Sequence, residues 1–261
     1  MTISRPTAIV TGGKQGLGLG TALALADRGF NIVIVDLEPA SEIDPGVFNA
    51  IKLKGVEFEY YQLDIADLSA HDSLLESVQH RFGRLDCLVN NAGIAARPLT
   101  DVLDLSPEAF DRAVDINLRG TFFLTQAFAN RLLTSPTIDN AYRSIIIVSS
   151  IAAEMVNIDR AQYCVTKSAL SMVTKLFAQR LGREGIFVHE IRPGFMQTAM
   201  IASAGKTPVD EWIADGRVPV PRWGQPEDVG VAIATLASGD MPYMTGQPLW
   251  VAGGLNLSPA P

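Results

Sequence analysis

The segment TGGKQGLG, residues 11–18, lies between an apolar run at 7–10 and a helical pattern that begins near residue 17. Glycines at positions 12, 16 and 18 allow a ligand to approach the backbone closely, and the start of a helix offers free N–H groups to an anion. The spacing differs from the common G-x-G-x-x-G pattern, so the string alone is a weak signal. Its position between a strand and a helix strengthens it. We therefore expect a turn that receives a pyrophosphate.

Short apolar runs and helical patterns alternate along the rest of the chain. Most runs are apolar throughout, which is typical of strands covered on both faces. The alternation predicts an α/β fold: a single-domain, Rossmann-type doubly wound parallel sheet of about seven strands with helices on both faces. The expected strands are Thr7–Val10, Asn31–Val35, Val56–Gln62, Cys87–Val89, Ser144–Val148, Phe187–Ile191 and Leu249–Val251, and the expected helices cover about 17–28, 70–82, 107–132, 161–182 and 226–238.

One stretch breaks this rhythm. Residues 195–223 hold mixed helical pieces and several prolines but no strand pattern. Such a segment suits a lid over a cleft better than a layer of the core, although a plain surface insertion is the alternative. We expect one domain over residues 1–261 that carries this lid.

The second expected strand runs into an acid, Asp36. In a dinucleotide-binding sheet an acid at this place accepts hydrogen bonds from the adenosine ribose, and its charge repels a 2′-phosphate. Leu37 and Glu38 follow without an arginine that could pair such a phosphate. The sequence thus predicts NAD in preference to NADP, although Lys14 in the glycine turn is a cation that could compensate. Asp64, after the third strand, is expected at the adenine edge.

Tyr163 and Lys167 lie four residues apart in an expected helix. Side chains at i and i+4 are about 5–6 Å apart at Cβ, so the phenol and the ammonium can share one small volume. Upstream, the strand at 144–148 ends at Ser149 and Ser150, at the edge of a parallel sheet where ligands bind. A free tyrosine titrates at about 10, so acid–base work near neutrality needs its pKa lowered by roughly 2–3 units. A nearby ammonium and the charge of a nicotinamide are expected to supply that shift.

Taken in order, these motifs resemble those of the short-chain dehydrogenase/reductase family. T-G-x-x-x-G-x-G spans Thr11–Gly18, N-N-A-G spans Asn90–Gly93, Ser150 precedes Y-x-x-x-K at Tyr163 and Lys167, and P-G lies at Pro193 and Gly194 with Thr198 after it. The likeness covers essentially the whole chain.

The resemblance implies a catalytic group of four residues. Tyr163 is expected to be the acid/base, and Lys167 to bind the nicotinamide ribose and acidify the phenol. Ser150 is expected to hold the substrate oxygen beside Tyr163, and Asn117 to complete a proton relay, unless it is only a buried amide bonded to backbone. Thr198 is expected near the nicotinamide carboxamide. The full set of expected cofactor contacts is Gly12, Lys14, Gln15, Gly16, Leu17, Gly18, Asp36, Leu37, Asp64, Ile65, Asn91, Ala92, Gly93, Tyr163, Lys167, Pro193, Gly194, Met196 and Thr198.

The expected reaction is reversible hydride transfer between NAD and a secondary alcohol or carbonyl. Similar C-termini occur in 3-oxoacyl-[acyl-carrier-protein] reductases, but those commonly prefer NADPH and dock an acidic carrier. Asp36 and a net charge of −7 favour instead a sugar, a polyol or another small polar alcohol. The acyl reductase is the alternative, and a catalytically silent nucleotide sensor is the non-enzymatic one. Arg97, Arg160 and Lys206 could bind an anionic substrate, with solvated surface charge as the alternative.

Composition argues against several kinds of partner. The chain has 261 residues, of which 48% are hydrophobic and 19% charged, as in a globular protein. Scattered basic residues and the negative net charge argue against nucleic acid. The start Met1–Pro6 is polar, no apolar run approaches about 18 residues, and Cys87 and Cys164 have no partner at metal or redox spacing. We expect a cytoplasmic protein without a membrane or metal role. The resemblance implies homotetramers or homodimers packed through the helices at about 107–132 and 161–182.

Overall fold

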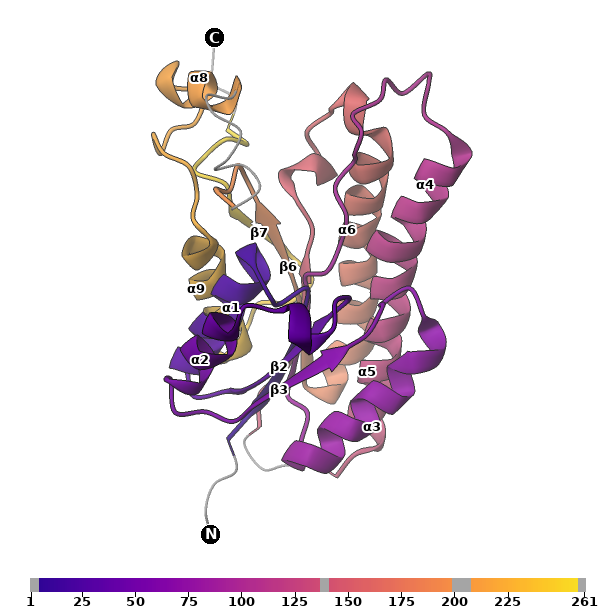
Figure 1. The fold of residues 1–261 in the computed structure, drawn as a ribbon, viewed down its shortest axis with the longest axis vertical. Coiled ribbons are helices and arrows are strands. Elements are labelled where there is room, and N and C mark those ends of the chain that lie inside the picture. Colours follow the sequence, from indigo (N-terminus) through magenta and orange to yellow (C-terminus); the bar gives the residue numbers. More distant parts are fainter. Residues whose placement is uncertain (1–4, 137–140, 199–207, 258–261) are drawn as a thin grey trace.

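The computed structural model describes residues 5–136, 141–198 and 208–257. At its centre is one seven-stranded sheet in the order β3-β2-β1-β4-β5-β6-β7, and every pairing is parallel (Figure 1). The predicted α/β fold is therefore confirmed. The strands are β1 (Thr7–Thr11), β2 (Asn31–Asp36), β3 (Phe58–Gln62), β4 (Cys87–Asn90), β5 (Arg143–Val148), β6 (Ile186–Pro193) and β7 (Pro248–Val251).

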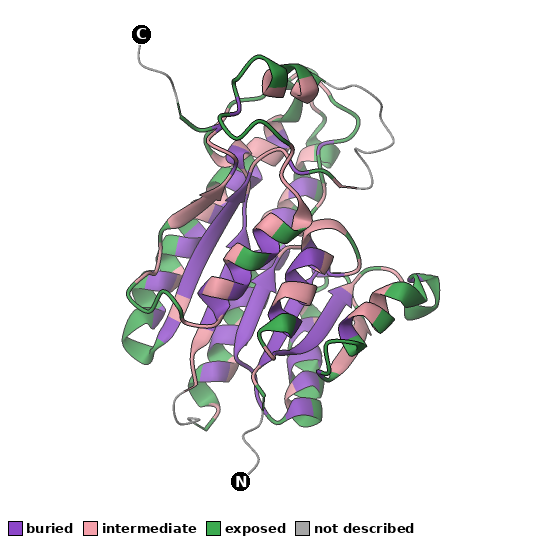
Figure 2. Ribbon diagram, turned by 90° about the vertical axis from the view of Figure 1, so that its left-hand side faces the viewer, coloured by how far each residue is buried: buried purple, intermediate pink, exposed green. Residues whose placement is uncertain are grey.

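Helices cover both faces of the sheet, and the strands between them are the most buried part of the molecule (Figures 1 and 2). One apolar core lies under α3, α5 and α6, and the other lies under α1, α2 and α9. This two-sided burial explains why the strands are apolar without alternation. The helices are α1 (Gly16–Asp27), α2 (Pro45–Lys52), α3 (His71–Phe82), α4 (Pro107–Ala113), α5 (Thr121–Thr134), α6 (Ala161–Leu181), α8 (Pro208–Ala214) and α9 (Pro226–Ala237).

The strand order reverses between β1 and β4, which pair with each other at the middle of the sheet. Connections leave these two strands in opposite directions, so a crevice opens outside their carboxyl ends. The glycine turn after β1 and the Asn90–Gly93 motif after β4 both lie at this point. The topology thus brings two distant sequence motifs to one cleft.

Two helices differ from the sequence prediction. The helix expected at about 107–132 is interrupted by a π-helical turn, Val114–Gly120, between α4 and α5. The segment contains no proline and keeps helical backbone angles at both ends, so the sequence does not reveal the turn. The short helix α2 was not expected, although Asp44 caps it by accepting a 2.8 Å hydrogen bond from the Gly46 N–H, and Pro45 follows at the first helical position.

The segment expected to form a lid is described in part, over 195–198 and 208–223. It carries α8, which lies at the end of the molecule opposite the N-terminus (Figure 1). Trp212 and Ile213 of α8 pack against a small apolar cluster that includes Ile151, just after β5. Within the described residues, every helix is too short or too polar to cross a membrane.

Candidate active site

The glycine turn brings the start of α1 directly onto the end of β1. A Cβ on Gly18 would lie 2.0 Å from the carbonyl oxygen of Gly12, so no larger residue fits there. Gly12 and Gly16 adopt positive φ angles of 64° and 54°, which favour glycine. The Asn91 amide closes the turn by donating to the carbonyl oxygens of Thr11 and Gly12 at 3.0 and 3.1 Å. The turn is therefore a rigid cradle whose N–H groups face the crevice.

A cleft of about 1300 Å³ extends from this turn across the carboxyl ends of the strands. It exceeds the roughly 300–1,000 Å³ of a drug-sized pocket, so its size suits an extended dinucleotide. Backbone at Gly16 is open to it, since a Cβ there would meet only a methyl group of Thr198 at 3.6 Å. Of the residues expected to bind the cofactor, those that line this cleft are Gly12, Lys14, Gln15, Gly16, Leu17, Gly18, Asp36, Leu37, Asp64, Ile65, Asn91, Ala92, Gly93 and Thr198.

Asp36 lies at one end of the cleft and is anchored by backbone. Its carboxylate accepts hydrogen bonds from the N–H groups of Lys14 at 3.2 Å and Leu37 at 2.9 Å. Burial raises the pKa of Asp36, and these two hydrogen bonds oppose that change. The Lys14 ammonium forms an ion pair with Glu38 and lies 4.0 Å from Asp36. The cation that could have paired a 2′-phosphate is thus held between two carboxylates.

Tyr163 and Lys167 both lie on α6, across the crevice from Asp36, and their side chains face a common space. The Lys167 Nζ lies 5.6 Å from the centre of the Tyr163 ring and donates a 2.9 Å hydrogen bond to the carbonyl oxygen of Val148. Lys167 is only 5% exposed, so its surroundings hold the ammonium in place. Ser150 follows β5, and its hydroxyl accepts a 3.1 Å hydrogen bond from the Ala152 N–H. The three side chains lie where the sequence pattern predicted a shared site.

The pKa values of this pair depend mainly on burial. Burial raises the pKa of Tyr163, and its contact with Ser150 and the charge of Arg160 lower that pKa only in part. Burial also lowers the pKa of Lys167 to about 8, an effect that the charge of Glu190 opposes. In the protein without a ligand the phenol is therefore protonated at neutral pH. The expected acidification by the ammonium and a bound nicotinamide together stays a prediction.

Asn117 lies in the π-helical turn and is 1% exposed. Its amide group accepts from the Ile94 N–H at 2.8 Å and donates to the Ile94 carbonyl oxygen at 3.0 Å. It also donates to the Thr166 hydroxyl at 3.3 Å, which links it to α6. A Cβ on Gly93 would lie 3.0 Å from Asn117 Oδ1 and 3.8 Å from Lys167 Nζ, so the amide and the ammonium border the same glycine. A relay role for Asn117 stays a prediction, since its contacts also suit a structural amide.

The expected cofactor residues that do not line the cleft are Tyr163, Lys167, Pro193, Gly194 and Met196. The Met196 side chain is buried in the core, where a Cβ on Gly224 would lie 2.4 Å from the sulfur. Gly194 packs against Ala252, and Pro193 is buried at the end of β6. Cofactor contacts of these residues stay a prediction.

The predicted anion-binding residues lie on exposed loops. Arg97 and Arg160 are both exposed, and the loops that carry them are joined by a 3.2 Å hydrogen bond from the Thr100 N–H to the Asp159 carbonyl oxygen. Arg160 is close enough for its charge to lower the pKa of Tyr163. Lys206 lies outside the described residues.

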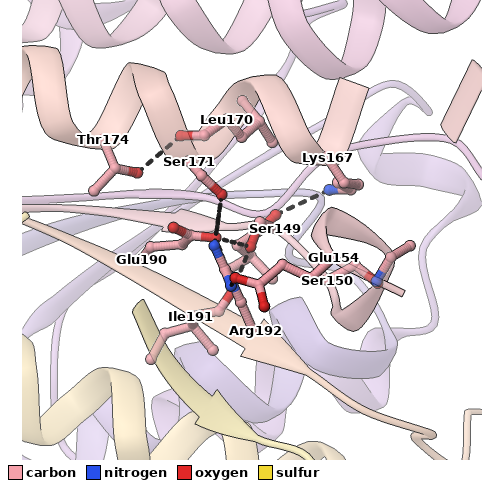
Figure 3. Close-up of polar contacts among 12 residues, drawn as sticks. Ser149, Ser150, Glu154, Lys167, Leu170, Ser171, Thr174, Glu190, Ile191 and Arg192 are labelled. Atoms are coloured by element: carbon pink, nitrogen blue, oxygen red, sulfur yellow. Dashed lines mark hydrogen bonds and ion pairs between the residues drawn. The ribbon is translucent and has the colours of Figure 1, made fainter. Parts of the chain in front are cut away.

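Sequence reasoning missed a buried ion cluster on β6. Glu190 and Arg192 both lie in β6 and are only 1% and 4% exposed (Figure 3). Charged residues are almost never buried unless they are paired, so a charge inside an expected core strand was the available signal.

Comparison with known proteins agrees with this geometry. The family model described as enoyl-(acyl carrier protein) reductase matches residues 12–256. The 3-oxoacyl-[acyl-carrier-protein] reductase FabG of Staphylococcus aureus is 32% identical over 251 residues, covering 96% of this chain and 98% of that protein. A (3R)-3-hydroxyacyl-CoA dehydrogenase of Canis lupus familiaris is 33% identical, with 96% of both chains covered. The crystal structure of a Brucella melitensis 3-oxoacyl-[acyl-carrier protein] reductase in complex with NAD is similar, with a TM-score of 0.92, 39% identity and coverage of 98% and 99%.

These likenesses and the cleft define an oxidoreductase built on a dinucleotide-binding α/β fold, which acts on carbonyl or hydroxyl groups. More narrowly, the chain belongs to the short-chain dehydrogenase/reductase family. The relatives do not support a sugar or polyol as the substrate and instead favour the acyl reductase alternative.

Proposed function

We propose that this protein interconverts a 3-oxoacyl thioester and the corresponding 3-hydroxyacyl thioester with NAD(H). The observation that carries the proposal is that Tyr163 contacts both Lys167 and Ser150, in a chain whose relatives are named for this chemistry. A protonated Tyr163 phenol can donate to a carbonyl oxygen.

In reduction, the Ser150 hydroxyl holds the substrate carbonyl oxygen and the Tyr163 hydroxyl gives its proton to that oxygen. A bound nicotinamide supplies the hydride. Lys167 stabilises the phenolate that Tyr163 becomes, since its ammonium faces the ring at 5.6 Å from the centre. The hydrogen bond from Lys167 to the Val148 carbonyl oxygen keeps the ammonium in that position. In oxidation the same groups act in reverse.

We infer NAD as the preferred cofactor from the end of the cleft at Asp36. Two backbone N–H groups hold the carboxylate there, in a position suited to ribose hydroxyls. Lys14 is already paired with Glu38, so a 2′-phosphate would meet two carboxylates without a free ammonium. A relative solved with NAD supports this preference.

Exposed apolar side chains on two joined loops support an acyl substrate over a polar one. The two loops joined by the Thr100–Asp159 hydrogen bond expose several large apolar side chains, among them Leu103 at 91% and Val156 at 89%. Exposed apolar surface of this kind marks a binding region for apolar groups. The full set is Leu99, Val102, Leu103, Val156 and Ile158. The described parts of the expected lid, 195–198 and 208–223 with α8, are proposed to cover the cleft.

The exposed arginines Arg97 and Arg160 lie on the same loops and are proposed to bind the phosphates of the thioester carrier. Alanine at both positions is expected to raise the Michaelis constant for a coenzyme A thioester several-fold, and an unchanged constant contradicts this role.

An oligomer is proposed through the outer faces of α5 and α6. Val165, Met172 and Leu176 are each at least half exposed and are spaced seven and four residues apart, on one face of α6. Phe123 and Leu133 of α5 are also exposed. Burial of these side chains between two copies explains their exposure in one chain, and light scattering after size exclusion measures the expected dimer or tetramer.

The experiment uses acetoacetyl-CoA as the thioester and follows NADH absorbance. We expect turnover with NADH, and a lower kcat/KM for every sugar or polyol offered with NAD. Tyr163→Phe should reduce turnover by at least ~10²-fold, as for loss of a general acid. Tyr243→Phe is the matched control, because Tyr243 is fully exposed and should retain activity. A polyol that outperforms the thioester refutes the substrate, and near-normal activity of Tyr163→Phe refutes the mechanism.

A further inference from the structure

A buried carboxylate on β6 joins three elements of the active site. Glu190 accepts hydrogen bonds from Ser149 Oγ at 2.5 Å, Ser171 Oγ at 2.9 Å and Arg192 Nε at 2.6 Å, all at the same oxygen, Oε1 (Figure 3). Ser149 directly follows β5, Ser171 lies on α6, and Arg192 is two residues farther along β6. Three donors on one oxygen hold this carboxylate in one position.

The partners of Glu190 are the immediate neighbours of the catalytic residues. Ser149 directly precedes Ser150, and its neighbour Val148 accepts the hydrogen bond of the Lys167 ammonium. Ser171 is four residues after Lys167, so both side chains project from the same face of α6. The Val148 carbonyl oxygen binds the Lys167 ammonium, and the hydroxyl of the next residue, Ser149, binds Glu190 (Figure 3). Glu190 and Lys167 are both almost completely buried, and the charge of Glu190 raises the pKa of Lys167.

The other charges around this carboxylate are balanced. Arg192, which pairs with Glu190, also pairs with Glu154, which is exposed, and donates to Ser171 Oγ at 2.9 Å. Its guanidinium lies 4.9 Å from the centre of the Trp250 ring, which completes its enclosure. The positive charge of Arg192 is thus already shared by two carboxylates, Glu190 and Glu154.

The remaining titratable groups of the site are on α6 and just before it. Tyr163 faces Lys167, and the charge of Arg160 lowers the pKa of Tyr163. Lys167 itself is 5% exposed, and its cation needs a compensating negative charge in this setting. Glu190 is the group whose charge raises the pKa of Lys167 against burial.

We propose that Glu190 is a positioning residue for the catalytic pair, which keeps Lys167 protonated by placing a fixed negative charge behind the end of β5. This inference rests on the proposed role of Lys167 in the reaction. Without that charge, Lys167 loses its proton at lower pH, and Tyr163 loses the cation that stabilises its phenolate. Glu190 touches neither substrate nor cofactor in this assignment and acts only through Lys167.

The test measures the Lys167 pKa directly, by NMR titration of ε-¹³C-lysine in the whole protein without cofactor. Lys167→Arg assigns the signal, which is one of six lysines. Glu190→Gln keeps the shape and removes the charge, and it should lower the Lys167 pKa by about one unit, the low end for a neighbouring opposite charge. Because this readout needs no substrate, it remains decisive if acetoacetyl-CoA is not turned over.

Three further variants make the outcome specific. Ser171→Ala removes a neutral hydrogen bond to the same oxygen and should shift the Lys167 pKa far less. Glu184→Gln removes an exposed carboxylate paired with Arg180 near the end of α6 and should leave it unchanged. If Glu190→Gln does not fold, Arg192→Gln tests the same electrostatic effect in the opposite direction. Arg192 competes with Lys167 for the charge of Glu190, so its loss should raise the Lys167 pKa.

The pH profile of reduction gives the second readout. In Glu190→Gln the basic limb of kcat/KM should move to lower pH by the same amount as the Lys167 pKa, whereas a purely structural role would lower the rate without moving the limb. A Lys167 pKa that is the same in wild type and Glu190→Gln overturns the proposal. A shifted Lys167 pKa without any thioester reduction leaves this inference standing and refutes the proposed substrate.

Discussion

Charge at the ribose end of the cleft is the perturbation that most directly tests the NAD assignment. Asp36→Asn keeps the shape and one acceptor oxygen of the side chain but removes its charge. A hydrogen bond to a charged group contributes about 1.5–3 kcal/mol, against about 0.5–1.5 kcal/mol for a neutral one. The difference, about 1.5 kcal/mol, corresponds to roughly tenfold weaker NADH binding. NADPH should bind more tightly at the same time, because its 2′-phosphate no longer meets this carboxylate.

The structure predicts a second step from Lys14. In Asp36→Asn the ammonium stays paired with Glu38, so the ratio of NADH to NADPH affinity should fall by about one to two orders of magnitude. Adding Glu38→Gln frees Lys14 to bind the phosphate, which should lower the ratio by about one further order of magnitude. Glu38 is about 40% exposed at its side chain, so this replacement should cost little stability.

Fluorescence titration of NADH and NADPH with each variant measures these ratios without a substrate. Asp64→Asn is the matched control, since it removes another carboxylate from the same cleft, at the expected adenine edge that both cofactors share, and should affect both cofactors equally. A ratio that changes less than threefold in Asp36→Asn would show that Asp36 does not bind the ribose. Identical ratios in the single and double variants would show that Lys14 is not restrained by Glu38.

Three further outcomes are expected. Gly18→Ala should weaken NADH binding at least about tenfold in the same titration, because its Cβ would lie 2.0 Å from a carbonyl oxygen. In Gly16→Ala the nearest atom to the new Cβ is 3.6 Å away, so this variant should lose only the roughly 1 kcal/mol that its positive φ angle costs. Equal losses of NADH affinity in the two variants would contradict this reasoning. Reduction should slow as pH rises through about 8, where Lys167 loses its proton, and a flat profile from pH 7 to about 9 would refute that assignment. Burial lowers the pKa of His189 to about 4 from an ordinary value of 6.5. As pH falls between these two values the unfolded chain is protonated before the folded one, so the free energy of unfolding should decrease by up to about 3 kcal/mol. Urea unfolding of His189→Gln should lack this loss.

The sheet and the glycine turn could be predicted because each depends on residues close together in the sequence. An unbroken apolar run such as β5 indicates a strand that is covered on both faces. The order of the motifs predicted that Asp36 and Tyr163 lie at the carboxyl edge of the sheet. Lys167 could likewise be assigned to Tyr163 from helical spacing alone.

The parts that could not be predicted depend on contacts between distant elements. The Met196 side chain turns into the core because Gly224 leaves space for it, 28 residues away in the sequence (224 − 196). In the sequence, Glu190 only interrupts an apolar strand. Its role becomes visible when the fold brings Ser171 and Arg192 beside it. The pKa of Tyr163 depends on how completely the fold encloses the ring, which no local pattern records.

The π-helical turn that carries Asn117 makes the chain sensitive to length at one place. A π-helical turn closes i→i+5 hydrogen bonds and therefore holds one residue more than a regular turn, so deleting one residue between Val114 and Gly120 would leave too few residues to keep both the turn and the packing of the flanking helices. Either the Asn117 amide would leave Ile94, or α5 would turn Leu124 and Phe128 out of the core. Point substitutions on the solvent side of this turn should be tolerated, whereas a one-codon deletion there should abolish the enzyme.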